Sequence, residues 1–297
     1  MHICYDEIQG GISITRMYGD SPVVRVPGEV DGKKTIAINE YAFSEKNVTT
    51  NRKDIPYKEL DEGTVCELAG GYIKEIIIPD SVRSLGGFCF YQCVNLKKLT
   101  LGKNVQIGSD AFMNCRKLDE IHIAASVLEP TCLRQILAQR TQHTTAVFDD
   151  AAIYFSEYSE QYDLIGPAHI FELNIEGEGF RARKCFDGDV FLPEMYDDIF
   201  EKARDTEDTK TLCIMASLRL QKPELLKEEK KKIYQEYLLE NISEFLDESI
   251  RKKDLKLFLD MKRKGIINNE HIVLCLQKLN AAGWIEGTRE VISENNL

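Results

Sequence analysis

The fold is decided by a repeat within residues 72–123, YIKEIIIPDSVRSLGGFCFYQCVNLKKLTLGKNVQIGSDAFMNCRKLDEIHI. The apolar pattern L-x-x-L-x-L occurs three times in this stretch, with offsets of 23 and then 22 residues. Its members are Ile73, Ile76 and Ile78, then Leu96, Leu99 and Leu101, and finally Leu118, Ile121 and Ile123. The last three residues of each pattern alternate between inward and outward positions, which predicts a short strand with one buried face.

A second set of residues repeats with the same spacing. Phe90 and Phe112 are 22 residues apart, and so are Cys93 and Cys115. Two independent columns with one period indicate a solenoid, in which each turn stacks on the next. Because a strand of three or four residues cannot bury its apolar face alone, we expect the turns to share one core lined by the phenylalanine and cysteine columns.

These turns resemble BspA-type leucine-rich repeats, which read approximately IP-x-S-V-x-x-I-G-x-x-A-F-x-x-C-x-x-L. Residues 76–96, IIIPDSVRSLGGFCFYQCVNL, carry nearly all of that pattern. Residues 11–43 resemble the divergent N-terminal turn of the same proteins, with Ala42 and Phe43 as its A-F pair. Phe43 and Phe90 are 47 residues apart, about two periods, so we expect residues 47–71 to hold a degenerate turn with an insertion. The resemblance implies a solenoid of short strands.

Both ends of a solenoid need covers, because an open stack exposes apolar surface and strand edges. At the front, residues 11–19 and 23–26 are expected to pair as a hairpin. At the back, residues 132–140 repeat apolar side chains at helical spacing, which predicts a short helix as the lid. The predicted solenoid with its capping ends covers residues 1–142.

After the solenoid, the pattern changes first to strands and then to helices. Strand-like runs occur at 146–148, 152–155, 169–175 and 180–186, and GEG at 177–179 predicts a hairpin between the last two. Apolar residues at three-four spacing then predict helices over 208–220, 223–250, 254–265, 268–279 and 285–294. We therefore expect an α+β chain, with a hairpin-containing β connector at 143–192 and an α-helical repeat-like domain at 193–297.

The order of these parts resembles a group of bacterial leucine-rich-repeat proteins. In that group a BspA-type solenoid is followed by a short β element, a YD-containing junction and an α-helical array. Residues 152–186 and the segment MYDDIF at 195–200 carry this resemblance. The group has no assigned chemistry, so the resemblance implies a fold and not an activity.

Composition and charge exclude several classes of protein. With 38 basic and 49 acidic residues the formal net charge is −11, which disfavours nucleic acid and anionic lipid as partners. The sequence has no apolar run of membrane-spanning length and no secretory signal, so we expect a cytoplasmic protein without membrane insertion. A cell-surface location is the alternative if a signal has been removed. The nine cysteines include no CxxC pair and are expected to be reduced thiols, most of them in the core.

The sequence contains no motif for nucleotide binding, metal binding or hydrolytic catalysis, so we expect no cofactor, no metal site and no catalytic residue. His122 lies on the outward side of its predicted strand, and Cys93 and Cys115 belong to the buried column, which disfavours a Cys-His dyad. One enzymatic alternative places a site at the junction of the β connector and the helices. Its residues are Tyr196, Asp197 and Asp198 with His169 or Arg181.

The remaining candidate site is the outer wall of the solenoid. Polar positions between the apolar ones face outward, and parallel stacking aligns them into a ladder across neighbouring strands. The ladder consists of Glu75, Ile77, Lys98, Thr100, Glu120 and His122. Its mixed charge with one exposed aliphatic residue favours a protein partner. The sequence therefore predicts a non-enzymatic scaffold that binds another protein, while an exported surface adhesin and the junction enzyme are the alternatives.

Overall fold

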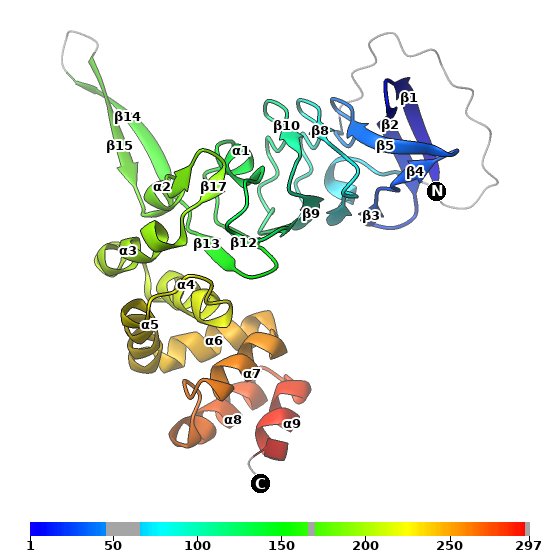
Figure 1. Ribbon diagram of the computed structural model, residues 1–297. Coiled ribbons are helices and arrows are strands. Elements are labelled where there is room, and N and C mark those ends of the chain that lie inside the picture. The colour runs from blue at the N-terminus through cyan, green and yellow to red at the C-terminus, as the bar shows by residue number, and fades with distance from the viewer. Residues whose placement is uncertain (46–65, 166–169, 295–297) are drawn as a thin grey trace. The chain divides into compact units, whose positions relative to one another are not determined.

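The computed structural model describes residues 1–45, 66–165 and 170–294 (Figure 1). Two compact units make up the chain. The first contains Met1–Asp149, Glu157–Ser159 and Phe186–Phe191. The second contains Asp150–Ser156, Glu160–Cys185 and Leu192–Leu297.

The first unit is an N-terminal leucine-rich-repeat solenoid of short strands. Its helical elements are the short helix α1 (Leu133–Leu137) and a 3-10 turn at Gly70–Tyr72. Its strands are β1 (His2–Ile8), β2 (Gly11–Gly19), β3 (Val23–Arg25), β4 (Glu29–Val30), β5 (Lys33–Ile38), β6 (Cys66–Glu67), β7 (Glu75–Ile77), β8 (Ser84–Leu85), β9 (Lys98–Gly102), β10 (Gln106–Ile107), β11 (Glu120–Ala124), β12 (Thr144–Val147), β16 (Phe186–Asp187) and β17 (Val190–Phe191).

Two sheets run along this unit. In the first, β3, β7, β9, β11 and β12 are neighbours in that order, and each pair is parallel. In the second, the order is β1, β2, β5, β8 and β10, with parallel pairing from β2 onward. One turn contributes β7 and β8, and the next contributes β9 and β10, so the 22-residue period places one strand in each sheet.

Phenylalanine and cysteine columns line the core between the turns, as the sequence predicts. The rings of Phe43, Phe90 and Phe112 stack with centroids 5.3 and 5.4 Å apart and nearly parallel planes. The Cys93 thiol donates to the Phe43 carbonyl at 3.2 Å, and the Cys115 thiol donates to the Phe90 carbonyl at 3.1 Å. Each thiol therefore joins its turn to the preceding one, and a cysteine suits this position because it is small, apolar and still a weak donor.

The front end differs from the sequence prediction of a hairpin between residues 11–19 and 23–26, which is wrong. β2 pairs with β1 and β5, whereas β3 joins the other sheet beside β7. Val24 faces Ile76 in register and is buried, so the apolar side chain of this segment continues the repeat column. The buried Arg16 on β2 donates to three carbonyls of residues 41–44 and ties down the first turn.

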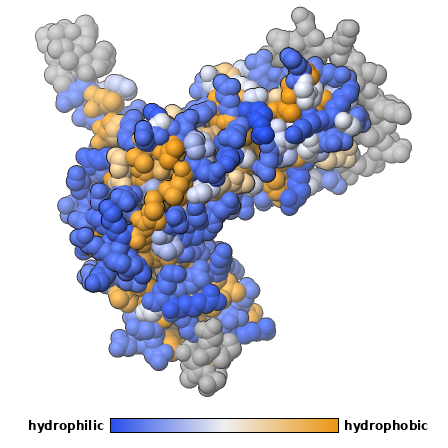
Figure 2. Space-filling model, viewed as in Figure 1, coloured by the Kyte–Doolittle hydropathy of each residue, from blue (hydrophilic) through white to orange (hydrophobic). Residues whose placement is uncertain are grey.

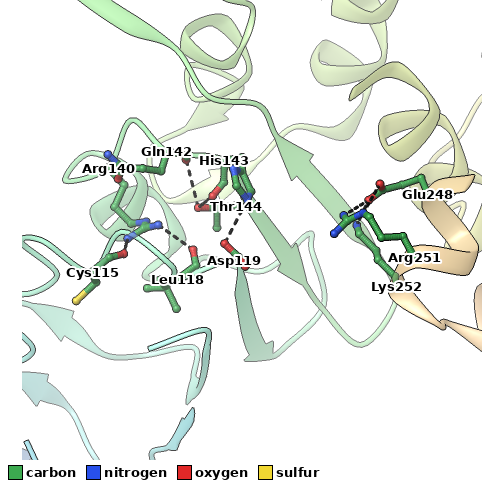
Figure 3. Close-up of polar contacts among 10 residues, drawn as sticks. All are labelled: Cys115, Leu118, Asp119, Arg140, Gln142, His143, Thr144, Glu248, Arg251 and Lys252. Atoms are coloured by element: carbon green, nitrogen blue, oxygen red, sulfur yellow. Dashed lines mark hydrogen bonds and ion pairs between the residues drawn. The ribbon is translucent and has the colours of Figure 1, made fainter. Parts of the chain in front are cut away.

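The predicted helix at the back end is confirmed as α1. Beyond it, the buried Arg140 donates through Nη1 to the Cys115 carbonyl at 2.7 Å and through Nη2 to the Leu118 carbonyl at 2.8 Å (Figure 3). These carbonyls belong to the last L-x-x-L-x-L turn. A buried guanidinium thus satisfies the backbone at each end of the described stack.

The second unit combines a small β element with a C-terminal helical array. Its strands are β13 (Ala152–Phe155), β14 (Ser159–Ile165) and β15 (Ile170–Glu176), and β14 and β15 form a two-stranded ribbon. Its helices are α2 (Gly179–Ala182), α3 (Pro193–Ala203), α4 (Thr209–Gln221), α5 (Glu228–Glu240), α6 (Ile242–Lys252), α7 (Leu255–Arg263), α8 (Ile272–Ala281) and α9 (Ile285–Glu294).

The predicted hairpin around GEG at 177–179 is wrong. β15 pairs with β14, and the segment read as a strand at 180–186 begins as helix α2. Gly177 has a φ of +100°, and a Cβ on Gly179 would lie 2.0 Å from the Ser156 carbonyl oxygen. These glycines permit a turn and a close backbone approach. Burial at Ala182 and Cys185 follows helical spacing.

The helical array agrees with the sequence except at one position. The single helix predicted over 223–250 is two helices, α5 and α6, joined at Asn241, whose side chain donates to the Tyr237 carbonyl. Both helices turn buried residues to the core, so the apolar spacing continues across the break. Gly265, with a φ of +76°, follows α7 as expected, and Asn268 caps the next segment by accepting from the Glu270 amide.

Within the described residues, no helix combines the length and apolar character needed to cross a lipid bilayer.

Candidate functional site

The outer ladder lies on the exposed side of the parallel sheet formed by β3, β7, β9, β11 and β12. Its six predicted residues fall into two rows of register partners. One row is Glu75, Lys98 and Glu120, and the other is Ile77, Thr100 and His122. All six are half-buried or exposed, while the residues between them in each strand are buried. The structure therefore brings together the residues that the repeat period aligns.

Both rows continue onto strands that the sequence prediction did not include. Val23 and Arg25 on β3 extend them at one end, and Thr145 and Val147 on β12 extend them at the other. Residues 23–26 and 146–148 read as strands, but neither carries the full L-x-x-L-x-L pattern. Their alternation alone was the available signal, and it gives no register.

Two histidine–carboxylate pairs lie at the β11 and β12 side of the sheet. His122 Nε2 is 3.0 Å from Glu120 Oε2, and His143 Nε2 is 3.2 Å from Asp119 Oδ1 (Figure 3). Lys98 lies between the two carboxylate-bearing strands in its row. The ladder thus presents charges of both signs beside aliphatic side chains, as on the mixed surface in Figure 2, where hydrophobic residues show in separate groups.

The junction residues take part in the packing of the helical unit. Asp197 on α3 accepts two hydrogen bonds from Arg219 on α4, each 2.8 Å, and a third of 2.8 Å from the Tyr234 hydroxyl on α5. The Asp197 and Arg219 side chains are 2% and 0% exposed. This ion pair therefore joins three helices inside the core, with its charges satisfied by one another.

The other junction residues lie in separate contacts. The Tyr196 hydroxyl donates to the Tyr154 carbonyl at 2.5 Å, and burial raises the pKa of Tyr196 well above its ordinary value. Asp198 is exposed and pairs with Lys230, and Arg181 pairs with Glu178. His169 lies outside the described residues. The structure does not gather Tyr196, Asp197 and Asp198 around one open site.

Another buried carboxylate, Glu248 on α6, is surrounded by cations. Arg251 donates to both of its oxygens at 2.9 and 2.6 Å, and Lys252 Nζ lies 3.4 Å from Oε1 (Figure 3). Burial raises the pKa of Glu248, but the hydrogen bonds from Arg251 and the charge of Lys252 outweigh burial and lower it. This cluster neutralises a helix surface.

The cysteines are free thiols, and most are buried. Burial raises the pKa of the Cys132 and Cys185 thiols to about 12. Thiols of this kind stay protonated near neutral pH and are poor nucleophiles and metal ligands. In the described part of the chain, no three His, Cys, Asp or Glu side chains are arranged to hold a metal ion.

Comparison with known proteins identifies the repeat. The family model described as the BspA type leucine rich repeat region matches residues 32–129 in 6 copies. This segment is therefore a BspA-type leucine-rich-repeat region, and a helical C-terminal region follows it. No curated protein and no solved structure matches the chain.

Proposed function

We propose that this protein is a non-enzymatic scaffold that binds another protein through the outer ladder of its solenoid. The observation that carries the proposal is the alignment of two rows of partly exposed side chains across five parallel strands. Side chains in such rows are held by the backbone ladder beneath them, so a partner meets a surface that needs little reordering on binding.

The size of the surface supports this role. Neighbouring strands are about 4.8 Å apart, so five strands present a face about 19 Å wide. A stable protein interface buries about 800 Å² on each side, which a face of this width reaches with the flanking loops. The row of Glu75, Lys98 and Glu120 alternates in charge, which favours a partner with a complementary alternation over a polyanion.

The compartment of this binding role stays a prediction, with the cytoplasm expected and the cell surface as the alternative. An adhesin would need export, and fractionation of native cells decides between the two locations.

The test of the ladder is a charge exchange that keeps the net charge. The protein carries Lys98→Glu together with Glu120→Lys, and captured partners are compared with those of the unaltered protein by crosslinking in native lysate. The matched control is Lys33→Glu with Glu7→Lys, which inverts an exposed ion pair on the other sheet.

We expect the ladder variant to lose partners that the control variant retains, because reversed charges oppose the partner's surface in every rung they touch. If every captured protein stays bound to the ladder variant, the ladder is not the binding site.

A further inference from the structure

A pocket of about 640 Å³ lies in the second unit, where β15 ends and α2 begins. Residues 175–178, Phe180, Arg181 and Thr206 line it. The pocket is separate from the outer ladder, which belongs to the first unit.

The most unusual group in this pocket is the Glu178 carboxylate. Its side chain is 6% exposed. One oxygen, Oε1, accepts from Arg181 and lies 3.5 Å from the Thr206 hydroxyl. The other oxygen, Oε2, has no hydrogen-bond partner. A buried carboxylate with an unused oxygen is unfavourable, and such a group calls for a donor from outside the chain.

The internal partner of Glu178 is suited to being displaced. Arg181 is 61% exposed and reaches the carboxylate from one helical turn away. Exposed ion pairs of this kind contribute little to stability, because water solvates the guanidinium almost as well as the carboxylate does. A second guanidinium can take its place and also reach Oε2, since its planar fork donates to both oxygens of a carboxylate.

The surroundings of the pocket favour a cation. Glu176 lines it beside Glu178, against the single charge of Arg181. The Phe180 ring already holds a cation, because Lys184 Nζ lies 4.8 Å from its centroid. Residues 157–178 contain six acidic residues and no Lys or Arg, so their field attracts positive charge toward the pocket.

The ribbon that leads to the pocket offers backbone and apolar contacts. It has two strands, so each strand has one neighbour in the sheet and one edge without a strand partner. On this ribbon Tyr162 is 66% exposed and Leu173 is 43% exposed. An extended peptide can therefore pair along an edge and place a side chain in the pocket at its base.

We propose that the pocket at the end of β15 binds an arginine side chain of an extended segment in a partner protein. The partner's guanidinium displaces Arg181 and donates to both oxygens of Glu178, while its chain lies along the acidic ribbon. This second binding site does not depend on the outer ladder.

The test is calorimetric titration of the full chain with the acetylated and amidated peptide TVRVT. The control peptide is TVQVT, and N-acetyl-arginine amide tests the side chain alone. We expect TVRVT to bind at least about tenfold more tightly than either control, since it loses a charged hydrogen-bond pair or the strand contacts when altered. Equal affinity for TVRVT and TVQVT, or for TVRVT and the capped amino acid, would overturn the proposal.

Three variants of the protein separate this site from general charge attraction. Glu178→Gln should weaken TVRVT binding by about tenfold or more, whereas Arg181→Gln should strengthen it severalfold by removing the internal competitor. Glu172→Gln removes the same charge from the ribbon outside the pocket and should change the affinity by less than about twofold. The proposal fails if Glu178→Gln and Glu172→Gln weaken binding equally, or if Arg181→Gln does not strengthen it. Because Arg181 is exposed, its variant remains informative even if Glu178→Gln disturbs folding, which circular dichroism monitors.

Discussion

Replacing Phe90 with alanine tests whether the aromatic column holds the solenoid together. Phe90 is fully buried and stacks on two rings, Phe43 and Phe112, whereas Phe112 stacks on one of these rings, Phe90. Loss of a buried phenylalanine side chain costs about 3–5 kcal/mol through lost burial and the cavity left behind. Each stacked pair adds about 0.5–1.5 kcal/mol beyond burial, so Phe90→Ala should destabilise the unit by that much more than Phe112→Ala.

The assay must report on the solenoid alone. Urea-dependent hydrogen–deuterium exchange of peptides that cover β9 and β11 gives the free energy of unfolding of this unit. The chain's one tryptophan, Trp284, lies in the second unit, so its fluorescence follows that unit separately. If Phe90→Ala costs less than about 1.5 kcal/mol, or no more than Phe112→Ala, the column does not form the core and the reasoning is refuted.

Two further predictions concern buried charges and thiols. Asp197→Asn leaves Arg219 without its counter-charge in the core and should cost about 3–5 kcal/mol, whereas the neighbouring exposed Asp198→Asn should cost less than about 1 kcal/mol. Urea unfolding followed by Trp284 fluorescence checks this, and equal losses would contradict a role for the buried pair. Burial raises the thiol pKa of Cys132 and Cys185 from 9.0 to about 12, so the folded state holds these protons where the unfolded state releases them. The unfolding free energy should therefore be constant below pH 9 and fall above it by about 1.4 kcal/mol per pH unit for each thiol, and a urea midpoint that stays flat to about pH 10.5 would refute this.

The solenoid could be predicted from the sequence because its period is visible in two columns at once. L-x-x-L-x-L sets the strands, and Phe90 over Phe112 sets the register, so the ladder residues follow by counting. β3 and β12 could not be placed in this way, since Val24 and Ala146 enter the sheet by pairing with distant strands without the repeat motif. The division of the chain at residues 142 and 192 stays a prediction.

The contacts of the second unit were harder to predict, because no repeat relates their partners. Asp197 and Arg219 are 22 residues apart in sequence on different helices, and only packing brings them together. The pocket at Glu178 was missed because GEG was interpreted as a hairpin turn. The spacing of Ala182 and Cys185, which fits a helix better than a strand, was the signal in the sequence that favoured the structure found.

The two end arginines have a consequence for how such a protein changes in evolution. Arg16 binds carbonyls of the first described turn and Arg140 binds those of the last, so neither side chain depends on how many turns lie between them. Duplicating or deleting one 22-residue module in the middle leaves both termini of the stack sealed. Such a change would widen or narrow the recognition surface by one rung, so the fold can adjust its reach to targets of different size without rebuilding its ends.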